Sequence, residues 1–156
     1  MDKSILKKDR MRFVKNDASS SLAYLAIVFN VLYFVSIYSS DVGNYYYSIT
    51  MGASVVYNLL FLLAAFLCSE GIKNYKLSYS IIITVIGALQ LVRILGYPID
   101  ALNSVTTDGK SVMELGQFIY TVAMLSLSAL SGVASGVIGI VRSEELRLYN
   151  KSLENS

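Results

Sequence analysis

The chain has 156 residues, of which 54% are hydrophobic and 15% are charged, and its formal net charge is +2. A soluble domain carries nearer a quarter of charged residues, so this composition indicates a membrane protein and not a large soluble core. There is no histidine and only one cysteine, Cys68. This excludes disulfides within the chain, CxxC redox chemistry and ordinary zinc sites, and we expect no cofactor.

Residues 1–20 form a basic segment in front of the first apolar run. One interpretation is a short helix on an anionic inner leaflet, with Ile5, Leu6, Phe13 and Val14 as a weak apolar face. The other is a disordered, positively charged tail that only sets the topology. Nucleic acid is not an expected partner, because lipid-seeking sequence begins directly behind this segment. The predicted inner-leaflet contacts are Lys7, Lys8, Arg10, Arg12 and Lys15.

Four apolar runs follow, and each is long enough for a transmembrane helix. They use up the chain, so we expect one all-α, four-helix transmembrane bundle over residues 21–141. The third run should end at Pro98, since proline cannot continue a helix. The tail, residues 142–156, could extend the fourth helix into water. The predicted spans are residues 22–38, 49–67, 79–97 and 118–141, joined by loops at 39–48, 69–78 and 98–117.

The distribution of positive charge predicts the orientation of this bundle. The N-terminal segment, the second loop and the tail hold eleven of the 13 lysines and arginines. The first and third loops hold only Lys110. By the positive-inside rule both termini are cytoplasmic. We therefore expect a multi-pass protein of the cell (plasma) membrane, in contact with an anionic inner leaflet.

The fourth run contains two rows of small residues that recur every four positions over residues 125–139. Residues four apart share a helix face, so the rows form one flat strip. In lipid, helices associate where small residues let two backbones come close. We predict that the other helices dock against this helix, or that it forms a dimer seam. The predicted helix-packing residues are Ser128, Ser131, Gly132, Ser135, Gly136 and Gly139.

Amide side chains lie near the middle of the other three spans, at Asn30, Asn58 and Gln90. We expect a polar layer near the midplane, completed by serines of the fourth span. One interpretation is interhelical hydrogen bonding that sets the register of the helices. The other is a solute path or a ligand pocket.

Arg93 is the only charged residue inside a predicted span. It lies one helical turn, about 6 Å, before Tyr97. It could extend outward to the interface and pair with Asp100 or Asp41. Alternatively, its guanidinium faces a cavity between helices and binds a lipid phosphate or the carboxylate of a partner.

Several classes of function do not fit this sequence. No predicted span contains the aspartate or glutamate that proton-coupled exchangers need. No catalytic set that requires histidine can be assembled, and the glycines of the fourth span are not followed by the Lys-Ser/Thr of a phosphate-binding loop. We therefore expect a protein that is not an enzyme, and we rank a lipid-handling enzyme last.

Two hypotheses for the function remain. In the first, the protein is a non-catalytic accessory or scaffolding subunit that packs in a larger membrane complex, such as a transporter, through its fourth helix. Its partners would be other integral membrane subunits or a second copy of itself. In the second, it is a small homo-oligomeric channel or carrier lined by the midplane amides and Arg93.

Overall fold

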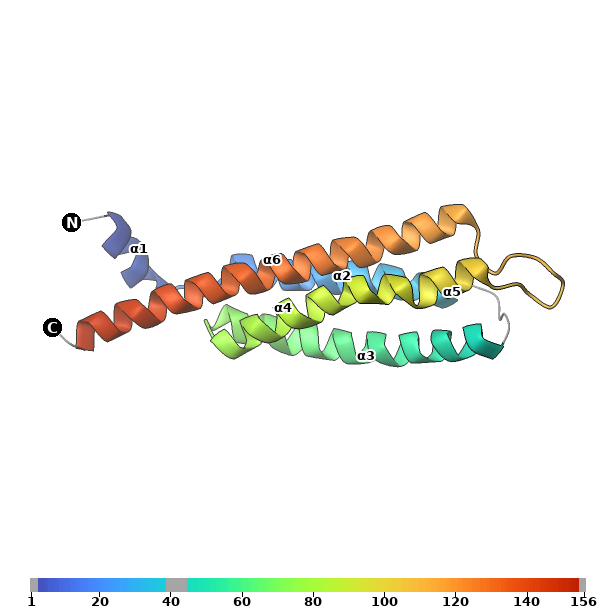
Figure 1. Cartoon of the computed structure of the whole chain (residues 1–156). Coiled ribbons are helices and arrows are strands. Elements are labelled where there is room, and N and C mark those ends of the chain that lie inside the picture. Colours follow the sequence, from blue (N-terminus) through green and yellow to red (C-terminus); the bar gives the residue numbers. More distant parts are fainter. Residues whose placement is uncertain (1–2, 39–44, 155–156) are drawn as a thin grey trace.

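The computed structural model describes residues 3–38 and 45–154, and nearly all of them are helical (Figure 1). Outside the helices, the described part of the chain contains one isolated bridge, between Val105 and Ser111. In chain order the elements are α1 (Lys3–Met11), α2 (Asp17–Tyr38), α3 (Tyr45–Lys73), α4 (Leu77–Val92), the 3-10 turn η1 (Arg93–Leu95), α5 (Tyr97–Asn103) and α6 (Leu115–Glu154).

Four stretches are long and apolar enough to cross a membrane: Asp17–Ile37, Ser48–Lys73, Leu77–Asn103 and Leu115–Glu154. Large apolar side chains cover the outside of the bundle, a pattern that suits lipid and not water. This is the architecture of a multi-pass, all-helical membrane protein, as the sequence predicts.

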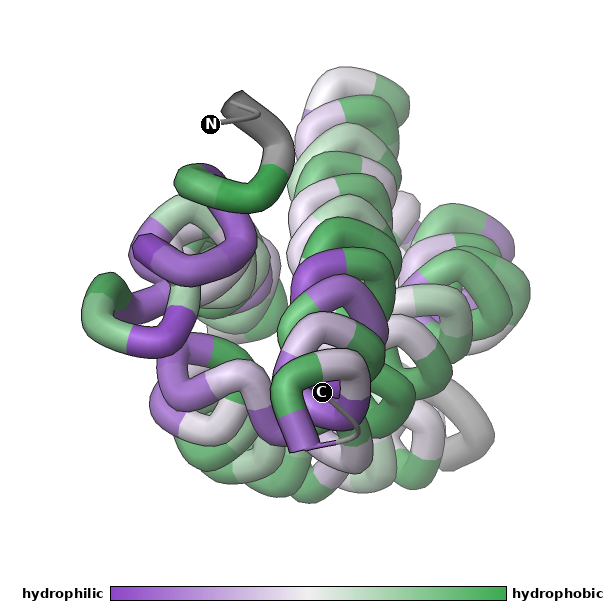
Figure 2. The backbone as a smooth tube through the Cα atoms, turned by 90° about the vertical axis from the view of Figure 1, so that its left-hand side faces the viewer, coloured by the Kyte–Doolittle hydropathy of each residue, from purple (hydrophilic) through white to green (hydrophobic). Residues whose placement is uncertain are grey.

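The four long helices form an up-and-down bundle in which α2 and α4 each pack against both α3 and α6 (Figure 1). The two chain ends lie at the same end of this bundle, and we call it the terminal end. There α1 crosses the bundle axis instead of following it. Figure 2 views this end directly and shows hydrophilic residues in α1, in the linker that follows it and in the last turns of α6.

Two clusters of buried apolar side chains hold the helices together. The cluster toward the terminal end joins α2, α3 and α4, and the cluster at the opposite end joins α2, α5, α6 and the loop before α6. The members of the first are Ala26, Phe61, Ala65, Cys68, Ile72 and Ile83. The members of the second are Tyr33, Ile37, Tyr97, Ala101, Val112, Met113 and Leu125.

The third span differs from its prediction, because Pro98 does not end it. The α4 helix is followed by η1 at Arg93, and the helical conformation is interrupted at Gly96. Pro98 lies in the first turn of the next helix, α5. Proline is tolerated there because the first N–H groups of a helix have no intrahelical acceptor. Part of the predicted loop at 98–117 is therefore helical, and the span continues to Asn103.

The other boundaries also extend beyond the predicted apolar runs. Residues 39–44 of the predicted first loop lie outside the described residues, and α3 already begins at Tyr45. The α6 helix runs through 40 residues, which is about 60 Å and twice the thickness of the hydrocarbon core. The tail thus extends the fourth helix, as expected, and α1 confirms the helical interpretation of the N-terminal segment.

Candidate functional site

The small-residue strip of α6 lies inside the bundle, where it contacts α2 and α4. Five of its six members are buried, and Ser131 is half-buried. Two serines bind the backbone of α2: the Ser128 hydroxyl donates to the Ala26 carbonyl (2.9 Å) and the Ser135 hydroxyl to the Ser19 carbonyl (2.6 Å). The strip is therefore the surface against which helices of the same chain dock. It is not available as a dimer seam, and this part of the prediction was wrong.

The glycines of the strip explain how closely α4 and α6 approach. A Cβ atom on Gly87 of α4 would lie 3.0 Å from the backbone nitrogen of Val133. A Cβ atom on Gly136 would overlap Thr84 and lie 2.6 Å from the Ser80 carbonyl oxygen. Two backbones can meet at this distance only where side chains are absent.

The three midplane amides all face the inside of the bundle and are fully buried. Neither amide atom of Asn30 or Asn58 is hydrogen-bonded to a described residue. The expected interhelical hydrogen bonds between the amides are thus not formed by these two side chains. Gln90 differs, because its Oε1 accepts from Nη1 of Arg93 at 2.7 Å.

Arg93 is turned toward the inside of the bundle. Its guanidinium lies over the rings of Tyr33 and Tyr57, with 4.7 and 4.4 Å from Cζ to the ring centroids. Its Nη2 donates to Ser54 Oγ at 2.9 Å, and that hydroxyl also lies 2.8 Å from the Tyr33 hydroxyl. Cation–π contacts contribute up to about 2 kcal/mol when the cation is desolvated. All of these partners are neutral.

A cavity of about 210 Å³ opens beside Arg93, between α3 and the α4–α5 junction. Most of its lining is apolar or weakly polar, and Arg93 is the only charged residue among the residues that line it. Those residues are Thr50, Ala53, Ser54, Tyr57, Arg93, Gly96 and Tyr97. The site can therefore present one cation to a small anionic group in a surrounding of low polarity.

The expected pairing of Arg93 with Asp100 is wrong. Asp100 instead accepts a hydrogen bond from the Thr50 hydroxyl at 2.8 Å. The other proposed partner, Asp41, lies outside the described residues. Along the chain, Arg93 lies ten residues before the end of the candidate span at Asn103, with the break at Gly96 between them.

The predicted inner-leaflet residues lie on α1 and the linker behind it, at the terminal end. Lys7, Arg10 and Lys15 line a cavity there, together with residues of α6 and the α3–α4 corner. Lys8 is half-buried, and Arg12 is exposed 3.7 Å from Asp9. Their contact with a leaflet stays a prediction.

Sequence reasoning missed the neutral partners of Arg93 and the contribution of α6 to the cavity that Lys7, Arg10 and Lys15 line. Tyr57 lies nine residues inside its span, although tyrosine usually marks the membrane interface. The position of Tyr57 was therefore a usable signal, whereas Tyr33 lies only four residues from the end of its span. Arg142 lines the same cavity as the three cations and is the first cation after the fourth apolar run.

Comparison with protein-family models, with curated proteins and with solved structures finds no match to this chain.

Proposed function

We propose that this protein is a non-catalytic accessory subunit of a larger membrane complex, and that it docks through the Arg93 cavity. The partner is a transmembrane helix that carries an aspartate or glutamate. The observation that carries the proposal is a half-buried cation, surrounded by neutral groups, at a cavity on the side of the bundle.

The electrostatics of Arg93 support a partner with a negative charge. Among the described residues, Arg93 forms no salt bridge. An arginine within a membrane helix costs up to about 2.5–3.5 kcal/mol on insertion scales, the value that applies at the helix centre. The two tyrosine rings, Gln90 and Ser54 offset part of this cost, and a carboxylate would supply the missing charge.

The direction of the Arg93 guanidinium favours a side chain of a helix over a lipid headgroup. Its Nη1 binds Gln90, one turn closer to the terminal end, and its Cζ lies over the rings of Tyr33 and Tyr57. A lipid phosphate at the surface would require the guanidinium to turn in the opposite direction. A carboxylate on a neighbouring helix can be placed at this depth by the helix itself.

Transport through a homo-oligomer is the second candidate function. It is favoured by the buried amide atoms of Asn30 and Asn58, which have no partner among the described residues. These amides face the inside of one bundle, however, and not a surface that a second copy could share. Solute flux in proteoliposomes that Asn58→Leu abolishes would favour this candidate over the accessory role.

The accessory role can be tested by site-specific photo-crosslinking in native membranes. A photoreactive amino acid at Ala53, which is exposed and lines the cavity, should give one discrete adduct with another membrane protein. Arg93→Gln should lower the yield about tenfold, because losing a charge-assisted contact costs more than about 1.4 kcal/mol. Arg93→Lys keeps the charge and should retain part of the yield.

The matched control places the same photoreactive group at Leu130, which is 64% exposed on α6 and far from the cavity residues in sequence. This position should not give that adduct. The reactive segment of the partner should contain an acidic residue within a span. An adduct that persists in Arg93→Gln, or one made only with a second copy of this chain, would refute the proposal.

A further inference from the structure

The terminal end of the bundle contains a basic cavity of about 280 Å³ between α1, the α3–α4 corner and α6. Its charged lining combines four cations with one acid, Glu145. The cations are Lys7, Arg10, Lys15 and Arg142. They come from distant parts of the sequence, so the folded chain concentrates positive charge more than the N-terminal segment does alone.

Asn16 holds the three sides of this cavity together. Its backbone N–H donates to the Lys73 carbonyl at 2.9 Å, and its Oδ1 accepts from Arg142 Nη1 at 2.6 Å. Asn16 is completely buried. Arg142 forms no salt bridge with any residue that the structure describes. Its guanidinium is therefore fixed in place while its charge stays available.

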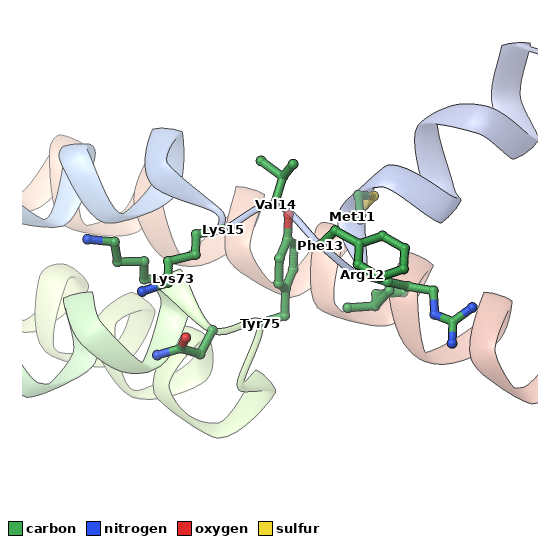
Figure 3. A pocket seen from close by; sticks show the side chains of 9 residues that line it. Met11, Arg12, Phe13, Val14, Lys15, Lys73 and Tyr75 are labelled. Atoms are coloured by element: carbon green, nitrogen blue, oxygen red, sulfur yellow. The ribbon is translucent and has the colours of Figure 1, made fainter.

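Tyr75 lines both this cavity and a second one of about 310 Å³, and Met11, Val14 and Lys15 also line both. In Figure 3 its ring stands between Lys15 and Lys73 on one side and Phe13 and Arg12 on the other. Burial raises the pKa of the Tyr75 hydroxyl, although the neighbouring Arg142 lowers it in part. At neutral pH the hydroxyl is thus protonated and can donate a hydrogen bond.

Exposed apolar side chains lie directly beside these cations. Phe13 is 81% exposed, and Leu6 and Val14 are also exposed on the same segment. Cationic and apolar side chains that alternate in this way suit the boundary between headgroups and acyl chains. Free phosphate would use only the cations, whereas a phospholipid would use both kinds of side chain.

We propose that this cavity binds the phosphate of an anionic phospholipid, with a preference for a phosphomonoester headgroup. Lys7, Arg10, Lys15 and Arg142 contact the phosphate, and Phe13 and Val14 enter the acyl boundary. Several cations around one site favour the doubly charged monoester over a singly charged phosphodiester. The proposal does not depend on the accessory role, because the Arg93 cavity lies elsewhere in the bundle.

The absence of tryptophan from the chain provides a direct test. Phe13→Trp introduces a single fluorophore at the site, and lipids with brominated acyl chains quench it on contact. In phosphatidylcholine vesicles, brominated phosphatidic acid should quench more strongly than brominated phosphatidylglycerol and should saturate. In this background Arg142→Gln should weaken the apparent affinity for phosphatidic acid about tenfold.

Two controls distinguish a specific lipid-binding site from general electrostatic attraction between a basic surface and anionic lipid. Arg147→Gln removes one charge from the same helix, at a residue that is exposed and paired with Glu144 at 2.9 Å, and it should leave the affinity unchanged. Arg142→Gln also removes the hydrogen bond to Asn16, so its effect could come from a change in structure. The double variant Lys7→Gln/Arg10→Gln changes only exposed positions of α1, and it should also weaken lipid binding.

The proposal is overturned if Arg147→Gln weakens quenching as much as Arg142→Gln, or if the two brominated headgroups quench equally. Release of the lipid by millimolar inorganic phosphate would identify free phosphate as the occupant and would also overturn it. The lipid site is supported if quenching by brominated phosphatidic acid is weakened in Arg142→Gln and in the α1 double variant but not in Arg147→Gln, and if inorganic phosphate does not release the lipid.

Discussion

At the scale of single residues, glycines that look equivalent in the sequence do different things in the bundle. A Cβ atom on Gly132 would lie 3.4 Å from the Gly87 Cα, which is an ordinary contact. At Gly136 the same atom would meet the backbone of α4 at Ser80 and Thr84. Gly116, in the first turn of α6, would have nothing within 4 Å of an added Cβ.

These contacts predict a graded response to alanine along α6. Gly136→Ala should destabilise the bundle by about 1–3 kcal/mol, since backbone must shift to make room. Gly132→Ala should be nearly neutral, and Gly116→Ala should be neutral or stabilising by up to about 1 kcal/mol because alanine favours helix. Unfolding of the purified protein by SDS, followed by circular dichroism, measures the difference. Equal effects at all three positions would contradict the close α4–α6 contact.

At the scale of elements, the α3–α4 corner has an unusual helix end. The Lys76 N–H donates to the Gly71 carbonyl at 3.1 Å, and the Tyr75 N–H donates to the Ile72 carbonyl at 2.9 Å. This is the hydrogen-bond pattern of a Schellman motif, whose left-handed position normally carries glycine. Here Tyr75 adopts it with φ of +56°. The side chain that lines both cavities of the terminal end is therefore held by a strained backbone.

The strain at Tyr75 predicts opposite rankings for two substitutions. Asparagine tolerates the left-handed conformation, whereas a β-branched residue does not. Tyr75→Val should therefore be less stable than Tyr75→Asn by about 1–2 kcal/mol, although valine keeps more apolar surface. The same SDS unfolding measurement applies. If the valine variant is as stable as the asparagine variant or more so, packing of the ring and not backbone conformation dominates at this corner.

At the scale of the whole molecule, the fold gathers both termini, α1 and most of the basic residues at one end of the bundle (Figure 2). The opposite end carries the α5–α6 loop, which turns at Gly109 with φ of +76°. Such a charge asymmetry orients membrane proteins with the basic end in the cytoplasm. The structure makes the two ends distinct, and their assignment to the two sides of the membrane is a prediction.

Cysteine labelling of intact cells tests this orientation. A membrane-impermeant maleimide should label Asp108→Cys, in the exposed loop before α6, and should not label Asn74→Cys at the exposed corner of the terminal end. The natural Cys68 is only 2% exposed, so the parent chain should serve as an unlabelled control. Permeabilised cells should show labelling at both introduced positions. The reverse pattern in intact cells would place the termini outside.

The sequence by itself determined the membrane class, the presence of four apolar spans, the small-residue strip of α6 and the positions of Asn30, Asn58 and Gln90 within their spans. These properties follow from local hydropathy and helical periodicity, which depend only on neighbouring residues. Tertiary structure alone decided that the strip contacts α2 and α4 of the same chain, and that Arg93 turns inward between Tyr33 and Tyr57. It also placed Arg142 beside α1 to complete the basic cavity. These outcomes depend on which helices become neighbours and on how each rotates about its axis, and no local pattern in the chain encodes either choice.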